Sequence, residues 1–119
     1  MPPINVDDLL KNSYMIHLPK DERKLEFQRK QFAFHGLKMP NIFIACTDDE
    51  NGFFHFALDK SHYTVVKNAK ERGLPFVLVF EDDIYMCNGI RDRLQDVLNK
   101  IPEDCQYLQL GWTKNDNSC

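Results

Sequence analysis

The chain has 119 residues, with 15 basic residues against 18 acidic ones and a net charge of -3. This length allows one domain with a substantial core. Nucleic acid is not expected as a partner, because Lys and Arg do not cluster into a stripe that would neutralise phosphates. No apolar run reaches membrane-spanning length, and the N-terminus lacks the charged and apolar regions of a signal peptide. We therefore expect a soluble, cytoplasmic (intracellular) protein with no membrane span.

The cysteines are widely spaced and form no CxxC pair; they are Cys46, Cys87, Cys105 and Cys119. A zinc site that combines them with His55 or His62 fits no standard ligand spacing. We therefore expect free thiols in a reducing compartment, with the cysteines of apolar segments acting as small hydrophobic residues.

The pattern of apolar residues predicts alternating strands and helices within one domain. In chain order these are a strand over residues 13–18, a helix over 20–35, a strand over 41–46, a helix from 59 or 61 to 72, a strand over 76–81, a helix over 90–101 and a strand over 106–110. Residues 53–58 are ambiguous between a strand and a loop. This alternation predicts an α/β fold with a Rossmann-like, mostly parallel sheet and helices on both faces.

The predicted domain covers residues 13–112, after an N-terminal lead-in over 1–12 and before a polar tail over 113–119. The lead-in contains two prolines and enough apolar residues for about one helical turn. The lead-in is expected to carry little function, and the polar tail is expected to be frayed.

The chain is organised around residues 75–84, an apolar run that ends in three carboxylates. The run predicts a strand buried on both faces, and ligands collect at the carboxyl ends of such strands. We call Glu81, Asp82 and Asp83 the acidic motif. Strand alternation sends Glu81 and Asp83 to one side, so both can approach one hard cation such as Mn²⁺ or Mg²⁺. The alternative is a solvated turn, since acidic residues are common in turns.

Three further groups are candidates for binding. Ser61 and His62 are predicted at a helix start, where free backbone N–H groups suit an anion, although on their own they are better explained as a simple cap and a surface residue of the first turn. Arg23 opens the first long helix and can reach a diphosphate, although a charged helix residue is usually solvated. Residues 48–50 are also acidic and can hold a metal, although a mobile loop explains them better. Nothing marks a cysteine as an activated nucleophile.

Four sequence motifs together resemble glycosyltransferase family 25. This family contains galactosyltransferases of bacterial lipooligosaccharide synthesis and relatives that glycosylate collagen. The motifs are Leu-Asp-Lys-Ser-His-Tyr at 58–63, Gly-Leu-Pro at 73–75, Val-Leu-Val-Phe-Glu-Asp-Asp-Ile at 77–84 and Leu-Gln-Leu-Gly at 108–111. The first strand and its Arg-bearing helix also match, except that the usual Asn-Leu at the strand end is His17-Leu18 here.

The resemblance implies a fold similar to the nucleotide-sugar-binding half of the GT-A architecture. It implies a metal-dependent hexosyltransferase that moves a sugar from a nucleotide sugar, expected to be a UDP-sugar, to a hydroxyl of a glycan or other acceptor. The acidic motif would hold Mn²⁺ or Mg²⁺, with Asp83 in direct contact. Ser61, His62 and Arg23 would bind the donor.

The chain departs from the family in length. Members usually continue after the final strand with a portion that builds the acceptor site and supplies the general base, so a truncated member is expected and no catalytic base is assigned. Two alternatives to an active enzyme stay open. One is an inactive relic that serves as a binding or assembly module. The other is half of a site completed by a partner chain, as in a homodimer, which the exposed edges of a small sheet would favour.

Overall fold

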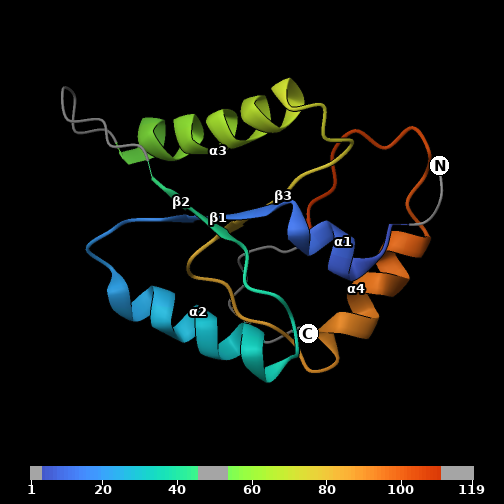
Figure 1. The fold of residues 1–119 in the computed structure, drawn as a ribbon, viewed down its shortest axis with the longest axis horizontal. Coiled ribbons are helices and arrows are strands. Elements are labelled where there is room, and N and C mark those ends of the chain that lie inside the picture. The colour runs from blue at the N-terminus through green and yellow to red at the C-terminus, as the bar shows by residue number, and fades with distance from the viewer. Residues whose placement is uncertain (1–3, 46–53, 111–119) are drawn as a thin grey trace.

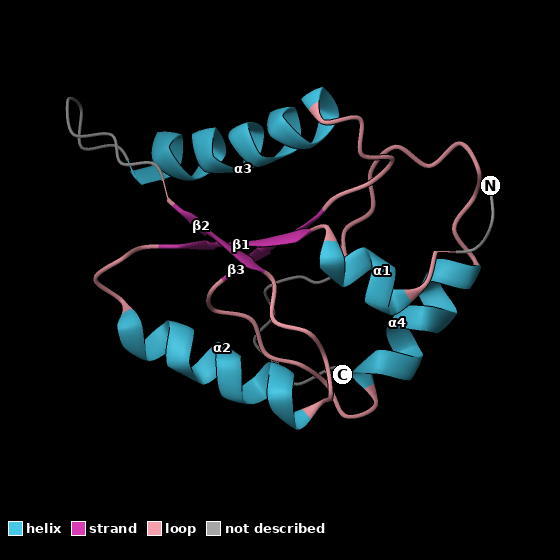
Figure 2. Cartoon of the chain, in the orientation of Figure 1, coloured by secondary structure: helices cyan, strands magenta, loops and turns pink. Residues whose placement is uncertain are grey.

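The computed structural model describes the backbone of residues 4–45 and 54–110 and the side chains of residues 4–45 and 60–110. Its elements are α1 (Val6–Lys11), β1 (Ser13–His17), α2 (Glu22–Phe34), β2 (Asn41–Ile44), α3 (Phe54–Glu71), β3 (Leu78–Glu81) and α4 (Ile90–Asn99). Helices alternate with strands along most of this length, as Figures 1 and 2 show. The predicted α/β class is therefore confirmed.

The three described strands form one parallel sheet in the order β2-β1-β3. The chain passes from β1 through α2 to β2, and then returns through α3 to β3 on the other side of β1. In Figure 1, α3 lies over one face of the sheet, and α1, α2 and α4 lie on the other side. The register pairs Ile16 of β1 with Glu81 of β3, which places the acidic motif at the carboxyl end of the central strand.

The most buried described strand is β1 rather than β3. Four of the five residues in β1 are buried, whereas all four residues in β3 are only half-buried. The expectation that the strand before the acidic motif is buried on both faces is therefore wrong. The reason is position: β1 has a neighbour on each side, whereas β3 pairs only with β1 among the described strands.

The main core lies between the sheet and the three helices on one side of it. It contains Val6, Leu9, Leu10, Met15, Phe32, Leu37, Leu94 and Leu98. Helix α1 supplies three of these residues, so the first twelve residues contribute to the core as well as leading into it. On the opposite face, α3 buries Val65 and Ala69. Gly36 and Gly73, with φ of 66° and 71°, follow α2 and α3, as glycines commonly do after helices.

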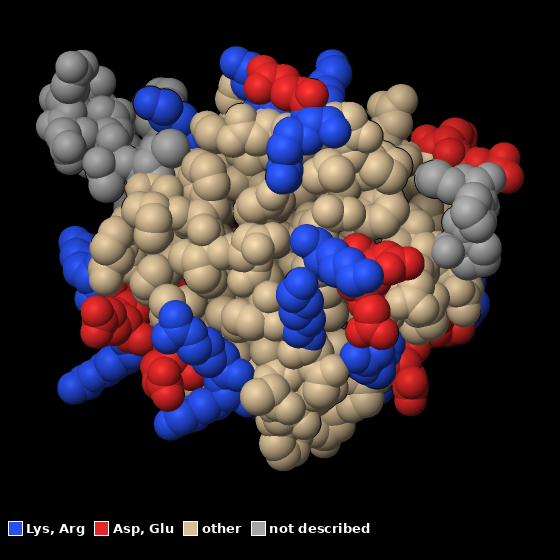
Figure 3. Space-filling view, in the orientation of Figure 1, with Lys and Arg blue, Asp and Glu red and all other residues tan. Residues whose placement is uncertain are grey.

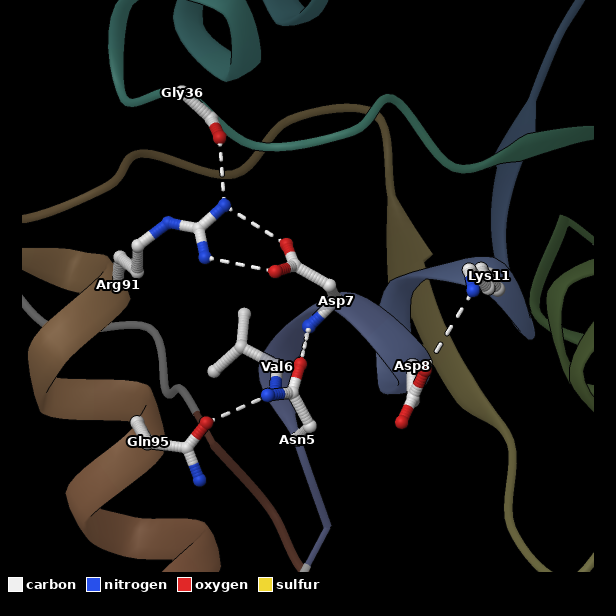
Figure 4. A network of polar contacts seen from close by, with 8 residues as sticks. All are labelled: Asn5, Val6, Asp7, Asp8, Lys11, Gly36, Arg91 and Gln95. Carbon is white, nitrogen blue, oxygen red and sulfur yellow. Dashed lines mark hydrogen bonds and ion pairs between the residues drawn. The ribbon is translucent and has the colours of Figure 1, made fainter.

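A polar clasp joins α1 to α4, and Figure 4 shows it from close by. The Gln95 side chain accepts a hydrogen bond from the Val6 N–H (3.0 Å) and donates one to the Ile4 carbonyl (2.9 Å). The Arg91 guanidinium donates to both carboxylate oxygens of Asp7 (2.8 and 3.2 Å) and to the Gly36 carbonyl. The clasp thereby ties the first helix to the last one and to the end of α2.

Two elements differ from the sequence-based expectations. Helix α3 begins at Phe54, so residues 54–58 are helical rather than strand or loop. The reason is visible in the sequence, where Phe54, Leu58, Ser61 and Val65 continue one helical spacing. The predicted strand over 106–110 is wrong, because this segment has no regular structure. Its alternation buries no face: Tyr107 is 81% exposed.

Among the described residues, the expected free thiol is confirmed at Cys105, which is exposed and free, while Cys46 and Cys119 lie outside the described part of the chain. Cys87 is disulfide-bonded, so the expectation is wrong there. Disulfides are typical of oxidising compartments, and the cytoplasmic location accordingly stays an expectation. Among the described helices, none combines the length and apolar character that crossing a membrane requires.

Candidate functional site

The acidic motif spans the end of β3 and the turn that follows. Glu81 is the last residue of β3, Asp82 and Asp83 form a turn, and residues 84–87 are irregular. Strand alternation sends Glu81 toward α3, where its Oε1 lies 3.8 Å from Nε2 of His62. That separation is longer than a direct hydrogen bond. Both side chains are 42% exposed, so this pair lies at the surface.

Asp82 points to the opposite side and pairs with His17, the last residue of β1. Nδ1 of His17 lies 2.8 Å from Oδ2 of Asp82, and His17 is only 3% exposed. An ionised carboxylate can only accept, so Nδ1 carries the proton in this pair. In the sequence, His17 stands out only as a departure from the family pattern. Its position at the end of a predicted strand was the available signal for a role.

Two glutamines of α2 bind the backbone just after β3. Gln28 donates through Nε2 to the carbonyls of Asp82 (3.2 Å) and Ile84 (2.9 Å). Gln31 donates to the same Ile84 carbonyl (3.1 Å) and accepts from the Met86 N–H (2.7 Å). We call residues 82–86 the acidic loop. Its backbone is thus held by side chains rather than by a strand partner.

Asp83 is the exposed member of the acidic motif. Its carboxylate and that of Glu81 are hard oxygen donors, which suit Mg²⁺ or Mn²⁺. Within residues 4–45 and 60–110, no group of three or more His, Cys, Asp or Glu side chains is arranged to hold a metal ion. One or two carboxylates are nevertheless enough when substrate phosphates complete the coordination. The residues therefore fit a divalent cation that binds together with a phosphate-bearing ligand.

The other predicted site residues lie in different settings. Ser61 is fully buried inside α3, two turns after its start, so the prediction of an anion site at a helix N-terminus is wrong for Ser61 and His62. The helix starts earlier because residues 54–58 extend it. Arg23 is exposed in the first turn of α2, which follows the carboxyl end of β1. The acidic residues 48–50 lie outside the described part of the chain.

A cavity of about 380 Å³ lies between α3 and the strands β1 and β2, and it contains none of the predicted site residues. Its lining residues are Tyr14, Phe43, Val65, Asn68, Glu71 and Arg72. The Arg72 guanidinium lies 5.5 Å from the centre of the Tyr14 ring and hydrogen-bonds its hydroxyl. Tyr14 is the second residue of β1, whereas Phe43 of β2 is level with Ile16 near the carboxyl end of β1, so the cavity runs along the α3 face of these two strands.

A comparison with models of known protein families shows the family of this chain. The model of glycosyltransferase family 25, described as an LPS biosynthesis protein family, matches residues 59–118. The chain belongs to this family. The match begins within α3 and includes Ser61, His62 and the whole acidic motif, on which the sequence resemblance partly rested. No curated protein and no solved structure matches the chain.

Membership in this family supports glycosyl transfer as the general reaction class of this chain. Such a reaction needs a sugar donor and an acceptor. The matched residues carry the acidic motif and His62, whereas His17, Gln28 and Gln31 lie before the matched region. The resemblance noted for residues 14–29 stays a prediction.

Proposed function

We propose that this family 25 chain transfers a sugar from a nucleotide sugar, a UDP-sugar in particular, to a hydroxyl of a glycan or other acceptor, using Mn²⁺ or Mg²⁺. The observation that carries the proposal is the exposed Asp83 in the turn after β3, two residues beyond Glu81 at the carboxyl end of that strand. The chain crosses from one side of β1 to the other to form this sheet, and ligands of doubly wound sheets bind at the strand ends where the order reverses.

In this proposal Asp83 and Glu81 hold the divalent ion, which would offset the charge of the departing nucleoside diphosphate. Arg23 lies at the start of α2, and its guanidinium suits the two phosphates through paired N–H groups. His62, on the α3 side of Glu81, offers a further donor. Transfer breaks the bond between the sugar and the diphosphate oxygen and forms one to the acceptor oxygen. The acceptor proton requires a base, and we assign none among the described residues.

The charge on the visible face of the molecule differs from that of a nucleic-acid site. On the face shown in Figure 3, basic and acidic side chains are interspersed. A polynucleotide requires a continuous basic track, whereas one diphosphate needs only a few cations and a metal ion. The mixed surface therefore favours a small phosphate-bearing ligand.

A second candidate function is a non-catalytic binding module, or half of a site that a partner chain completes. It is favoured by the lack of a three-ligand cluster among the residues whose side chains are described. Within the described sheet, β2 and β3 each have one strand neighbour, which leaves an edge on either side for a second chain.

Calorimetric titration tests the donor site directly. We expect Mn²⁺ alone to bind weakly and Mn²⁺ with UDP to bind together, because the phosphates complete the coordination. Asp83→Asn should weaken joint binding by about 100-fold, since even residues that only orient a metal ligand change affinity about 10- to 100-fold. Asp92→Asn, an acid in the first turn of α4, is the matched control and should bind normally. If the unmodified chain binds neither ligand, both the transferase and the donor-binding module are excluded.

Two further measurements separate the candidates. Hydrolysis of a UDP-sugar, or its transfer to any of a panel of hydroxyl acceptors, would support the enzyme. Binding without turnover would support the module. Light scattering that shows a monomer while turnover is intact would exclude the shared site.

A further inference from the structure

We propose that Gln28 and Gln31 of α2 are positioning residues that fix the acidic loop and thereby aim the Asp83 carboxylate at the bound cation. This role rests on the proposed function, because it matters only if Asp83 is a ligand. Neither glutamine needs to touch the cation or the donor.

The contacts of the two side chains bracket Asp83. Gln28 binds the carbonyl of the residue before Asp83 and the carbonyl of the residue after it. Gln31 shares the second carbonyl and also accepts from the Met86 N–H. The backbone on both sides of Asp83 is therefore anchored to one rigid helix.

The two amides also orient each other. Nε2 of Gln31 donates to Oε1 of Gln28 at 2.9 Å, which leaves both N–H groups of Gln28 directed at the acidic loop. The two residues are three positions apart, so they lie on the same face of α2. No described buried side-chain nitrogen or oxygen lacks a partner, so this network is complete.

Burial makes the anchoring rigid. Gln28 is 0% exposed and lies one turn before Phe32, in the face of α2 that packs on the core. A buried amide costs free energy unless its hydrogen bonds are made. An apolar side chain would fill the same space without that requirement. The glutamine therefore supplies what an apolar residue cannot, namely donors for an irregular segment that has no strand partner.

The Asp82 side chain is fixed at the same time from the other direction. Its carboxylate is held by His17 and is only 13% exposed, whereas Asp83 is exposed. One loop thus has its backbone bound by α2 and one carboxylate bound by β1. Asp83 remains free to face a ligand, in a position that its neighbours define.

The test compares two glutamines that make the same kind of contact in different places. Gln28→Met keeps the length of the side chain but removes both donors to the acidic loop. Gln95→Met is the matched control, because Gln95 also clamps two backbone groups, those of Ile4 and Val6, away from the site. Both variants are titrated with Mn²⁺ and UDP by calorimetry, at a temperature where circular dichroism shows each one folded.

We expect Gln28→Met to weaken joint binding by about 10- to 100-fold, the usual effect of removing a group that orients a metal ligand. Gln95→Met should bind within about twofold of the unmodified chain although it too is destabilised. A purely structural role of Gln28 predicts the same small change in both variants. If Gln28→Met does not fold, the half-buried Gln31 provides the variant Gln31→Met, with the same expected direction.

The outcomes separate this inference from the proposed function. If the unmodified chain binds Mn²⁺ and UDP, and Gln28→Met or its substitute binds equally well, the positioning role is wrong and the donor site stands. If the unmodified chain binds neither ligand, the donor site is wrong and the positioning role falls with it.

Discussion

Two polar clasps hold this fold together, and they use different chemistry. The acidic loop is held by Gln28 and Gln31, which are uncharged, half-buried or fully buried, and bonded to the backbone. Helices α1 and α4 are joined by Gln95, which also bonds backbone groups, but in addition by Asp7 and Arg91, which are charged and lie at the surface (Figure 4); the difference between the clasps lies in this ion pair. Each clasp connects segments that are more than 50 residues apart in the sequence.

The two clasps should differ in how their hydrogen bonds and ion pairs respond to pH and salt. Uncharged hydrogen bonds inside a protein do not vary with pH or salt over the ordinary range, so they suit a segment that must present a ligand in one geometry. An exposed ion pair is screened by salt and changes with protonation. The backbone of the acidic loop is therefore held by contacts that depend little on pH and salt, whereas its Asp82 side chain is held by a second, titratable partner, His17.

The largest expected effect comes from the core that both clasps share. Phe32 is 0% exposed and packs edge-to-face on Phe80 of β3, with ring centres 5.5 Å apart. Phe32→Ala should lower the free energy of unfolding by about 3–5 kcal/mol, because it opens a cavity. Urea unfolding measures this loss. Phe34→Ala is the control, since Phe34 is 80% exposed. Equal effects of the two changes would show that the core does not support the clasps.

The next effect concerns the carboxylate on the buried side of the acidic motif. His17→Ala removes the partner of Asp82 and should cost about 1.5–3 kcal/mol, the usual range for a hydrogen bond to a charged group. His17→Asn keeps a donor at the strand end and should recover part of the loss. Urea unfolding of both variants at neutral pH checks this order. An Asn variant less stable than the Ala variant would contradict the hydrogen-bond explanation.

The surface clasp should depend on pH. The Arg91 guanidinium hydrogen-bonds Asp7 and lowers the pKa of that carboxyl below its usual 3.8. A pKa lowered on folding adds stability above the unfolded-state pKa, and that stability is lost as the pH falls through the folded-state pKa. Asp7→Asn should therefore be less stable than the unmodified chain at neutral pH, with the difference vanishing in acid.

Urea midpoints at neutral pH and at about pH 2 measure this change, and added salt should reduce the neutral-pH difference. A difference that persists unchanged in acid would show that Asp7 acts through packing rather than charge. Gln28→Met provides the contrast, since its effect should not follow the titration of a carboxyl group.

The smallest expected effect lies in a solvated pair outside both clasps. Lys100 contacts Asp96 at 3.0 Å, four residues earlier, with both side chains mostly exposed. Lys100→Ala should change the free energy of unfolding by less than about 0.5 kcal/mol. A larger loss in urea unfolding would mean that surface charges contribute more to this fold than the comparison of the clasps implies.

Local sequence patterns predicted the elements that bury a regular face. The spacing of Ile90, Leu94 and Leu98 predicted α4, and the apolar run before Glu81 predicted β3 at the acidic motif. The strand over 106–110 failed because alternation predicts a strand only where a neighbouring strand and a core are available. The start of α3 failed because a run of aromatic residues suits a strand and a helix equally.

The supports of the candidate site could not be predicted in the same way. Gln28 and Gln31 read as ordinary polar helix residues, since their partners lie 53 to 56 positions along the chain. A local pattern carries no information on such contacts. The motif that binds a ligand can be recognised along the sequence, whereas the groups that orient it become visible only in three dimensions.

During synthesis, the acidic loop is made after the residues that bind it. Chains are made from the N-terminus, and early segments can begin to fold before later ones exist. His17 and Gln28 emerge long before Asp82, which lies 65 and 54 positions beyond them. Until then, the side chains of His17 in β1 and Gln28 in α2 lack the acidic-loop groups that they bind in the folded protein. The acidic loop can therefore reach His17 and Gln28 only after β1 and α2 have long been synthesised.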